Sequence, residues 1–511
     1  MGKKKSVVLM WLLTIVIAVL CFITAFPTCT VPFTDGIKKW NPTVMQYDLG
    51  MDLGGGYYAY YYPEGVIPES EFRNNRNMTQ GDEREEYTNS YVEMDGVYVS
   101  KDPEDGIMSE DGETLNPEFV EAFNAAAKEI GARFAAKGYD DYRVSVISGC
   151  ALRVELPMSE ASKNQTAKES ATQALAVFAL TGEMTLKQGG EIVPELKDDD
   201  ASVKDLIKSI KVKSKYEVVY LQVDFTEKGK EVLENFKTEA EAAASDQSQS
   251  QSGSTQTTLD IVVGEESLLS FTTEHIDGDK IKYNIAQDSE KRYVETLAIL
   301  LNSAMENGGF DVQFRELTGS EIREFAPAYN ENVLMFLYAG LAVIILALLV
   351  FAIVRMGRYG VVNAYASLSY IVIVALCYAF ITKGVFAITL GSVLMFLIGL
   401  VLVNVLHHNI YSAIKAEFTL GKTVESSVKS GYKKTLWGTI DIYVVLLFGA
   451  LALLIGGAGL HTMAIQALIC VLAAAFCNLL WGRAINFTFL SASKNKYKYF
   501  RFVREDDDDD E

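Results

Sequence analysis

Histidine, cysteine and tryptophan are scarce in this chain of 511 residues, which contains four, six and four of them respectively. The region between residues 27 and 332 has one histidine, His275, and a surface position explains it adequately. No HExxH, GxSxG, P-loop or paired-cysteine zinc pattern occurs in that region. These absences argue against a hydrolase. They predict a protein that is not an enzyme, with no catalytic residues, no metal site and no cofactor.

The sequence also gives little support for a disulfide. Four of the cysteines lie in apolar segments: Cys21, Cys377, Cys470 and Cys477. Only Cys29 and Cys150 could meet in an oxidising compartment. We expect these two to be unrelated small residues rather than a bridge.

Positive charge is in deficit, because 46 Lys and Arg face 66 Asp and Glu and give a formal net charge of −20. Much of the excess acid lies between residues 27 and 332 and in the terminal run EDDDDDE. Nucleic-acid phosphates require Lys and Arg, so we expect no nucleic-acid partner. The terminal run is interpreted as a solvated end, with a partner site as the alternative.

Long apolar runs are abundant. A helix needs about 20 mostly apolar residues to cross the hydrocarbon core of a bilayer. Six stretches meet that requirement: residues 6–26, 333–354, 362–381, 386–406, 436–455 and 463–485, of which the third and sixth contain polar residues. The length of the first run and the lack of an A-x-A-like site favour an anchor over a cleaved signal peptide. The sequence therefore predicts an integral membrane protein with one transmembrane helix before a large polar region and five after it.

The lysines and arginines between these runs predict the orientation, since positive residues in short flanks stay on the cytoplasmic side. Lys3, Lys4 and Lys5 precede the first run, and further clusters follow the second, fourth and sixth runs. The two intervening turns contain only Lys383. We therefore expect residues 1–5 and the acidic tail at 486–511 to be cytoplasmic, and residues 27–332 to lie outside.

The region at 27–332 has the pattern of α+β units. Apolar residues recur at helical spacing after the capping residue Asn116 as far as residue 137, and further helices are predicted at 159–180, 227–237 and 289–305. Alternation at period two predicts the strands between them: a hairpin bent at Ser148 and Gly149, then EMTLKQ, YLQVDF, KIKYNIAQ and FDVQFRE. The recurrence of strand, helix and strand implies an internal duplication in which helices cover one face of a mixed sheet.

Two stretches interrupt this pattern. Residues 68–113 are rich in Glu, Asp, Asn and Gly and predict a loop-rich insertion or a small head. The tract at 239–258, EAEAAASDQSQSQSGSTQTT, lacks the apolar residues that a core needs and predicts a flexible linker.

The segment GMDLGGG at residues 50–56 precedes a tyrosine-dense strand, and its glycines would allow a close backbone approach at a sheet edge. It resembles the signature G-[LM]-D-L-x-G-G of the SecD family of protein-export subunits, in the RND superfamily, with Gly50, Asp52, Leu53, Gly55 and Gly56 at the motif positions. Five further stretches match in the family's order: ALRVELP, VDFTEKGKEVLENF, LDIVVGEESLLSF, YVETLAILLNSA and the membrane segment from AITLGSV to WGTID. The resemblance implies six transmembrane helices and an outer α+β domain of repeated ferredoxin-like units.

The resemblance also implies a proton relay, of which this chain has lost a part. The family's fourth-span Asp aligns with Val405, with Asn404 before it and His407 after it, whereas the fifth-span Asp is present as Asp441. His408 lies on about the same helical face as Asn404. A histidine close to Asp441 could replace the missing carboxylate, since imidazole titrates near physiological pH. The alternative, in which these side chains lie at the cytoplasmic interface, stays open.

By this resemblance the chain is a SecD-type accessory subunit of the Sec translocon. It would assist preprotein translocation across the bacterial cytoplasmic membrane, with coupling to the proton-motive force as an option. The implied partners are a SecF-like subunit, the SecYEG channel and unfolded preprotein. A second hypothesis is a translocon scaffold that has lost proton coupling. A third is an RND-type exporter of small molecules or lipids, which is disfavoured because such pumps usually duplicate the six-span module in one chain.

Overall fold

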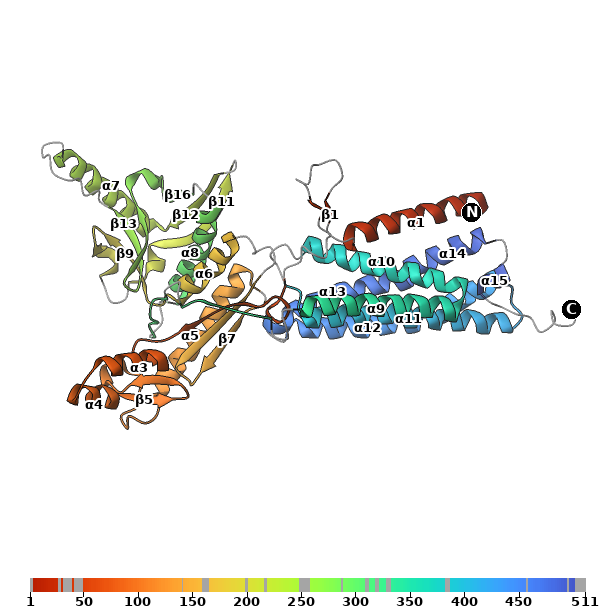
Figure 1. Ribbon diagram of the computed structural model, residues 1–511. Helices are drawn as coiled ribbons and strands as arrows, with labels where there is room; N and C mark the ends of the chain where they lie inside the picture. The colour runs from red at the N-terminus through yellow and green to blue at the C-terminus, as the bar shows by residue number, and fades with distance from the viewer. Residues whose placement is uncertain are drawn as a thin grey trace, which may run out of the picture. The chain divides into compact units, whose positions relative to one another are not determined.

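The computed structural model describes residues 3–25, 29–30, 39–40, 49–139, 141–158, 165–197, 201–215, 218–247, 258–285, 288–307, 312–317, 321–327, 332–381, 387–455, 458–493 and 496–500. The chain divides into two compact units. The helical unit comprises Met1–Gly55, Pro157–Ala161 and Ala326–Glu511, and the β-rich unit comprises Gly56–Leu156 and Ser162–Phe325. Figure 1 traces the chain through both units.

The helical unit contains six candidate membrane-spanning helices in its described residues, which confirms the prediction. Five are single helices: α1 (Lys3–Ala25), α9 (Val333–Met356), α10 (Arg358–Ile381), α11 (Leu390–Thr419) and α12 (Val424–Leu453). The sixth consists of α13 (Ala458–Phe476), a π-helical turn at Cys477–Trp481 and α14 (Gly482–Ala492), and α15 (Lys496–Phe500) follows it. The short strands β1 (Cys29–Thr30) and β2 (Lys39–Trp40) pair with each other after α1.

Helix α11 lies within the bundle and contacts four of its other helices, α9, α10, α12 and α13. Its apolar side chains pack in two clusters. Leu400, Val403 and Leu406 pack with residues of α10 and α13, and Ile410 and Ile414 pack with residues of α10, α12 and α14. Most side chains of α1 and α9 are instead exposed on the bundle surface, as expected for helices that face lipid.

The last membrane helix is longer than predicted. The apolar run ends near residue 485, and the sequence therefore predicted a tail from residue 486, but the helix continues to Ala492. Asn486 and Leu490 are buried in this extension. Polar Asn and Thr residues there lower the hydropathy without ending the helix, because helix formation continues wherever one face is packed. The acidic run at the C-terminus lies outside the described residues.

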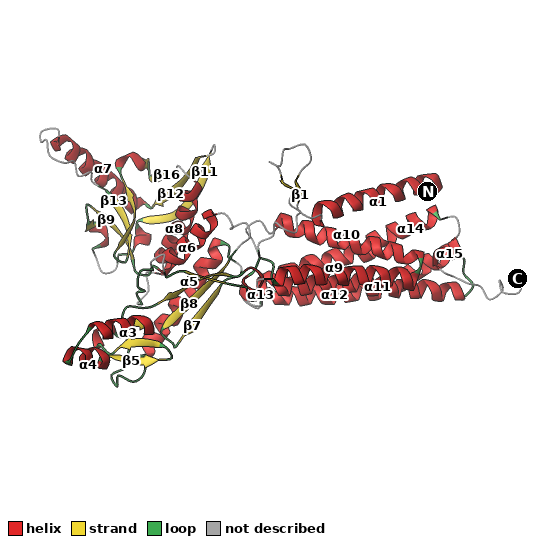
Figure 2. Ribbon diagram, in the orientation of Figure 1, coloured by secondary structure: helices red, strands yellow, loops and turns green. Residues whose placement is uncertain are grey.

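In its described residues the β-rich unit contains three four-stranded sheets and one three-stranded sheet; Figure 2 shows its strands in yellow. The first has the order β17 (Arg323–Phe325), β3 (Gly56–Tyr61), β8 (Ala151–Pro157), β7 (Arg143–Ile147). The second has the order β11 (Ile207–Lys215), β12 (Val218–Phe225), β16 (Lys280–Ile285), β15 (Ile276–Asp277). The third has the order β10 (Glu191–Ile192), β9 (Met184–Gln188), β13 (Leu259–Val263), β14 (Glu266–Phe271).

The first sheet has the strand order of a ferredoxin-like unit, because β3 and β8 are neighbours although α5 (Pro117–Lys137) and β7 lie between them in sequence. The second sheet is antiparallel throughout the pairs described. A four-stranded unit with helices therefore recurs, while its strand order does not. The capping residue predicted for α5 is confirmed, since Asn116 Oδ1 accepts a hydrogen bond from Glu118 N at 3.0 Å.

The insertion predicted at 68–113 is a folded head. It contains a sheet of order β4 (Val66–Pro68), β6 (Val97–Ser100), β5 (Tyr91–Met94) and the helices α3 (Glu69–Met78) and α4 (Asp82–Asn89). Its small core consists of Phe72 and buried aliphatic side chains such as Val66, Val97 and Val99, with three half-buried tyrosines around Phe72. The ring of Phe72 stacks on Tyr98 at 3.7 Å between centroids and lies 5.5 Å from Tyr87 and 5.7 Å from Tyr91. These four aromatic side chains add apolar area to the core of the head. The high content of Glu, Asp, Asn and Gly in residues 68–113 did not indicate this core.

Two other predictions in this unit need correction. Helix α7 (Glu227–Gln247) extends into the tract predicted as a linker, because Glu and Ala are strong helix formers, and residues 248–257 lie outside the described residues. The predicted strand FDVQFRE is reduced to an isolated bridge between Phe314 and Pro63. The remaining helices agree in place with the prediction: α6 (Gln165–Ala179) and α8 (Asp288–Asn307).

The scarce residues have ordinary positions. Cys150 is a buried free thiol, and the side chain of Cys29 lies outside the described residues. His275 is half-buried, and its Nδ1 accepts a hydrogen bond from Thr272 N at 3.0 Å, so it caps its own turn.

Candidate functional site

The segment Gly50–Gly56 leads into strand β3, and its first residues contact the start of α11 within the helical unit. Residues Met51–Gly54 form the short helix α2. Gly50 N donates to Ile388 O at 2.8 Å, and Leu390 N, the first residue of α11, donates to Asp52 Oδ2 at 2.6 Å. Leu53 is 1% exposed and packs in the apolar cluster around α11.

Asp52 is therefore a cap for α11. The first N–H groups of a helix have no partner within the helix, and a negative charge beside them is favourable. The side chains of Thr389 and Ser392 satisfy other groups of the same turn, since Thr389 Oγ1 accepts from Ser392 N at 3.3 Å and Ser392 Oγ accepts from Thr389 N at 2.8 Å. Asp52 adds the only carboxylate among the described partners of this turn.

We expect Asp52→Ala to destabilise the helical unit by about 1–2 kcal/mol, the usual cost of a lost cap with its charge. Asp52→Asn keeps an oxygen acceptor and should cost about 0.5 kcal/mol, which is the charge contribution alone. Thermal unfolding followed by tryptophan fluorescence measures both, since all four tryptophans belong to the helical unit. Equal losses in the two variants would mean that the charge, rather than the hydrogen bond, is what α11 requires.

Backbone geometry requires glycine at the last two positions of the segment, Gly55 and Gly56. Gly55 has φ 74° and ψ −164°, a region that only glycine adopts without strain. A Cβ at Gly56 would lie 2.1 Å from Leu156 O. The close approach expected from the sequence is confirmed, but not at a sheet edge. Strand β3 begins at Gly56 and lies between β17 and β8, so the close neighbour is the next strand of the sheet.

The tyrosines that follow divide between the two faces of β3, because successive side chains of a strand alternate. Tyr57 and Tyr61 are buried, whereas Tyr58, Tyr60 and Tyr62 are half-buried. The guanidinium of Arg153 lies 4.8 Å from the ring centroid of Tyr58 and 6.0 Å from that of Tyr60. Tyr60 and Tyr62, but not Tyr58, border a cleft of mixed polarity. Residues of α3 line its other side, and its lining includes Glu69, Glu71, Asn74 and Arg323.

A chain of buried amides lies in the middle of the bundle. Asn363 of α10 donates from Nδ2 to Asn404 Oδ1 at 2.8 Å, and Asn404 donates to Ser367 Oγ at 3.1 Å and to Leu400 O at 2.8 Å. The exposed fractions of Asn363, Ser367 and Asn404 are 0%, 1% and 9%. Polar side chains at such depth are costly unless paired, so this network fixes the register of α10 against α11.

His407 lies one turn after Asn404 and is fully enclosed by protein. Its Nδ1 is 2.9 Å from Val403 O, and since a carbonyl only accepts, Nδ1 carries the hydrogen. Its Nε2 is buried and makes no hydrogen bond of ordinary geometry in the described residues, nor do Asn363 Oδ1 and Asn478 Oδ1, although the Asn478 side chain lies beside the imidazole. A Cβ at Gly482 would lie 2.3 Å from this Nε2, so the imidazole lies against the backbone just after the π-helical turn. Such turns are frequent at functional sites.

The structure does not bring the four proposed relay residues together. Asn404 and His407 point into the bundle, whereas Asp441 is exposed on the surface of α12. No hydrogen bond or ion pair in the described part of the chain joins Asp441 to either histidine. His408 is half-buried, with its ring centroid 6.5 Å from that of Tyr411. Val405, which aligns with the family Asp, is 56% exposed.

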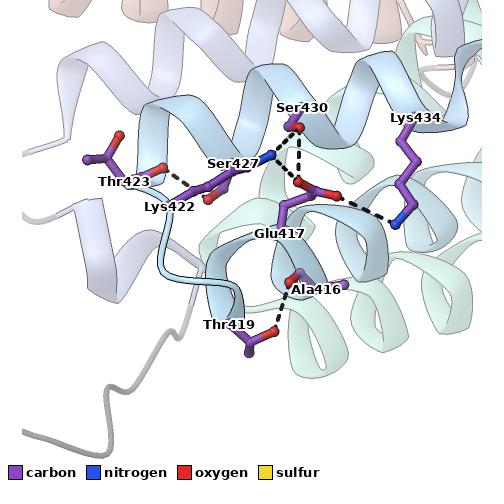
Figure 3. Close-up of polar contacts among 8 residues, drawn as sticks. All are labelled: Ala416, Glu417, Thr419, Lys422, Thr423, Ser427, Ser430 and Lys434. Atoms are coloured by element: carbon purple, nitrogen blue, oxygen red, sulfur yellow. Dashed lines mark hydrogen bonds and ion pairs between the residues drawn. The ribbon is translucent and has the colours of Figure 1, made fainter.

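The opposite end of α11 is held by a buried carboxylate, Glu417, whose side chain is 8% exposed (Figure 3). Glu417 accepts from Lys422 Nζ, from Ser430 Oγ at 3.0 Å and from Lys434 Nζ at 3.5 Å. Lys422 Nζ also donates to Ser430 Oγ at 2.9 Å. The α11–α12 turn is thus closed by one acid and two lysines. Helix α11 therefore has side-chain contacts that hold it at both of its ends.

Sequence reasoning missed Asn363, Asn478 and Glu417. For Asn363 and Asn478 the signal was present, because polar residues inside the third and sixth apolar runs were what weakened those runs as candidate spans, whereas Glu417 lies beyond the fourth run. A polar residue in a span normally faces the bundle interior. Which partner it meets depends on the rotation of each helix, and hydropathy carries no information about rotation.

Comparison with known proteins agrees with this description. No protein-family model and no curated protein matches the chain. Among solved structures, SecDF in a super-membrane-facing form is similar with a TM-score of 0.50 and 16% identity, covering 96% of this chain and 58% of that chain. SecDF from Thermus thermophilus, a translocon-associated membrane protein, gives a TM-score of 0.41 and 15% identity, covering 97% of this chain and 60% of that chain. The chain therefore has the SecDF fold and spans less than two thirds of those chains.

Proposed function

We propose that this protein is a SecD-type accessory subunit of the Sec translocon, which assists the passage of unfolded preproteins across the bacterial cytoplasmic membrane. The observation that carries the proposal is the SecDF fold over 96% of the chain. In this proposal both termini are cytoplasmic, in accord with the lysine-rich α11–α12 turn, and the β-rich unit lies outside. The half-buried tyrosine face of β3 and its cleft are the surface that we assign to preprotein contact, since aromatic rings and Arg153 accept many side chains.

A SecF-like subunit is the proposed neighbour of the exposed face of α11 and α12. Exposed apolar residues follow one another along that face of α11: Leu394, Ile398, Val401 and Val405. On α12, Val445 and Phe448 are 70% and 67% exposed and follow Asp441 by one and two turns. A carboxylate facing lipid is costly, whereas one facing a partner helix can be hydrogen-bonded. This chain covers 58% of the SecDF chain. We propose that the partner is a separate protein that corresponds to the remaining part of SecDF.

Proton coupling, in this proposal, uses His407 rather than a carboxylate inside the bundle. His407 is a buried ionisable side chain and lies one turn from the amide network of Asn363 and Asn404. Asp441 is instead exposed on the outer face of α12. The Nε2 of His407 is the group that a proton or a water molecule would reach. Moving one charge through 100 mV supplies about 2.3 kcal/mol, enough to bias a two-state motion. The scaffold hypothesis keeps the same fold and partners but assigns no proton to this site.

We expect His407→Gln to reduce preprotein export to the level seen when the proton gradient is collapsed, because glutamine keeps the volume and polarity but cannot titrate. His408→Gln, which changes the half-buried neighbour, is the matched control and should retain gradient-dependent export. Asp441→Asn should behave like His407→Gln if the SecF-like partner buries Asp441. Export is measured as the rate of preprotein maturation in cells that depend on this protein, with and without a gradient-collapsing agent.

Two outcomes would revise the proposal in different ways. Gradient-dependent export that is unchanged in both His407→Gln and Asp441→Asn would remove the coupling role and leave the scaffold. Export that is unaffected when the whole chain is depleted would refute the translocon function itself.

A further inference from the structure

Strand β11 ends its sheet and is hydrogen-bonded on one side, to β12, in the described residues. In an antiparallel pair each residue directs both its N–H and its C=O to one side, and the side alternates along the strand. The Asn302 side chain of α8 donates to Ile210 O at 2.8 Å and accepts from Ile210 N at 3.4 Å. Ile210 therefore directs both backbone groups to the open edge, and so do Val212 and Ser214 further along.

Asn302 thus occupies one position that a neighbouring strand would otherwise take. Its amide supplies one donor and one acceptor, as a strand residue does. No comparable side chain covers Val212 in the described part of the chain. The edge of β11 beyond Ile210 therefore presents backbone donors and acceptors in the register of an additional strand.

A groove runs along this edge between β11, the end of α5 and α8. Ile210, Val212 and Ile299 form its apolar floor, and Lys137, Lys211 and Lys213 stand at its sides. Lys137 is paired with Glu295 at 3.4 Å. Lys208, Lys211 and Lys213 are exposed, and no acidic group within the described residues forms an ion pair with them. This edge is a local positive patch on a chain whose formal net charge is −20.

We propose that the β11 edge binds an extended acidic polypeptide segment by strand addition. The segment pairs with the backbone groups of Val212 and Ser214. Its carboxylates lie opposite Lys211 and Lys213, where cross-strand pairs of opposite charge are favourable. The proposal rests on the proposed function, in which the segment belongs to the chain being exported. Lysines on a free edge also prevent edge-to-edge aggregation, and that is the competing explanation to be tested.

The test uses the full-length protein in lipid nanodiscs and fluorescent peptides as long as β11, which has 9 residues. One peptide alternates Glu and Val, a second alternates Lys and Val, and a third is the Glu and Val peptide with alternate backbone nitrogens methylated. We expect the acidic peptide to bind and both others to bind at least about tenfold more weakly, since one loses the charge pairs and the other the backbone hydrogen bonds.

The variant Lys211→Glu/Lys213→Glu should reverse the preference between the acidic and basic peptides. Lys128→Glu/Lys228→Glu, at two exposed positions on α5 and α7, makes the same change in net charge away from the edge and should leave binding unchanged. Strand addition would be overturned by equal binding of the methylated and unmethylated peptides, or by an equal loss of acidic-peptide binding in the two double variants. The lysines would then serve to prevent edge-to-edge aggregation.

Export in cells separates this proposal from the proposed function. Normal chain-dependent export together with no binding of the acidic peptide would refute strand addition alone. Specific binding of the acidic peptide in a protein whose depletion leaves export intact would keep the strand-addition site and refute the translocon function.

Discussion

Replacing Arg133 with Met should lower the free energy of unfolding of the β-rich unit by about 3–5 kcal/mol. Arg133 of α5 is 2% exposed. Its Nη1 donates to Phe178 O at 3.1 Å and Leu180 O at 2.7 Å, at the end of α6, and its Nε donates to Ser303 Oγ of α8 at 2.8 Å. Methionine fills the volume but leaves these buried acceptors without a donor, and that loss is the source of the expected effect.

Arg133 keeps its positive charge although its side chain is buried. Burial lowers the pKa of the Arg133 guanidinium to about 10, with Glu129 and Tyr61 acting in the opposite direction, so it stays protonated at neutral pH. Ser303 Oγ in turn donates a hydrogen bond to Glu129 Oε1 at 2.7 Å. A cation at the C-terminal end of α6 also interacts favourably with the helix dipole. One side chain therefore ties three helices together through donors that a lysine could not supply in the same geometry.

Hydrogen exchange measures this effect in the β-rich unit, through the protection of amides in α5, α6 and α8. The four tryptophans lie outside the β-rich unit, so their fluorescence reports whether the helical unit stays intact. Arg143→Met is the matched control, because Arg143 is 67% exposed and its ion pair with Glu155 spans 3.4 Å, so it should cost less than about 1 kcal/mol. Equal loss in both variants would contradict the role assigned to Arg133.

The membrane helices could be read from the sequence because the bilayer imposes a length and a composition directly on each span. The small head could not, because its core consists of a few aliphatic and aromatic residues spread through polar sequence. The cap formed by Asp52 was equally hidden, since its partner Leu390 is 338 residues away in the chain. A local pattern indicates that a segment is constrained, but it does not identify a distant partner.

The proposed relay residues illustrate the same limit. Alignment placed Asn404 and His407 beside the family's fourth-span relay position and Asp441 at its fifth-span position, but an alignment gives only positions along each helix. Whether side chains meet depends on helix rotation, which packing of Tyr370, Gly399 and the other core residues determines. A Cβ at Gly399 would lie 2.1 Å from Tyr370 Oη, so α10 and α11 fit in one rotation only. In that rotation His407 of α11 faces inward, whereas Asp441 is exposed on a different helix, α12.

Gly56→Ala should destabilise the β-rich unit by about 2–3 kcal/mol or prevent its first sheet from forming. The added Cβ would lie 2.1 Å from Leu156 O and 2.7 Å from Phe325 Cζ. The phenyl ring can move, but the carbonyl belongs to the adjacent strand β8 and moves only if β3 and β8 separate. The loss should therefore appear as faster hydrogen exchange in β3, β8 and β17, while α11 keeps its protection.

Gly131→Ala provides the matched control, since it introduces the same methyl group in the same unit. Its nearest neighbour is Tyr142 Cε2 at 3.5 Å, an ordinary contact distance, and the residue lies inside α5. Alanine in a helix interior is favoured over glycine by about 0.5–1 kcal/mol, so this variant should be neutral or more stable. If Gly56→Ala proved as stable as Gly131→Ala, the contact between β3 and β8 would not be what requires glycine at the end of the signature segment. The constraint would then lie in the backbone angles of Gly55 alone, which Gly55→Ala would test in the same assay.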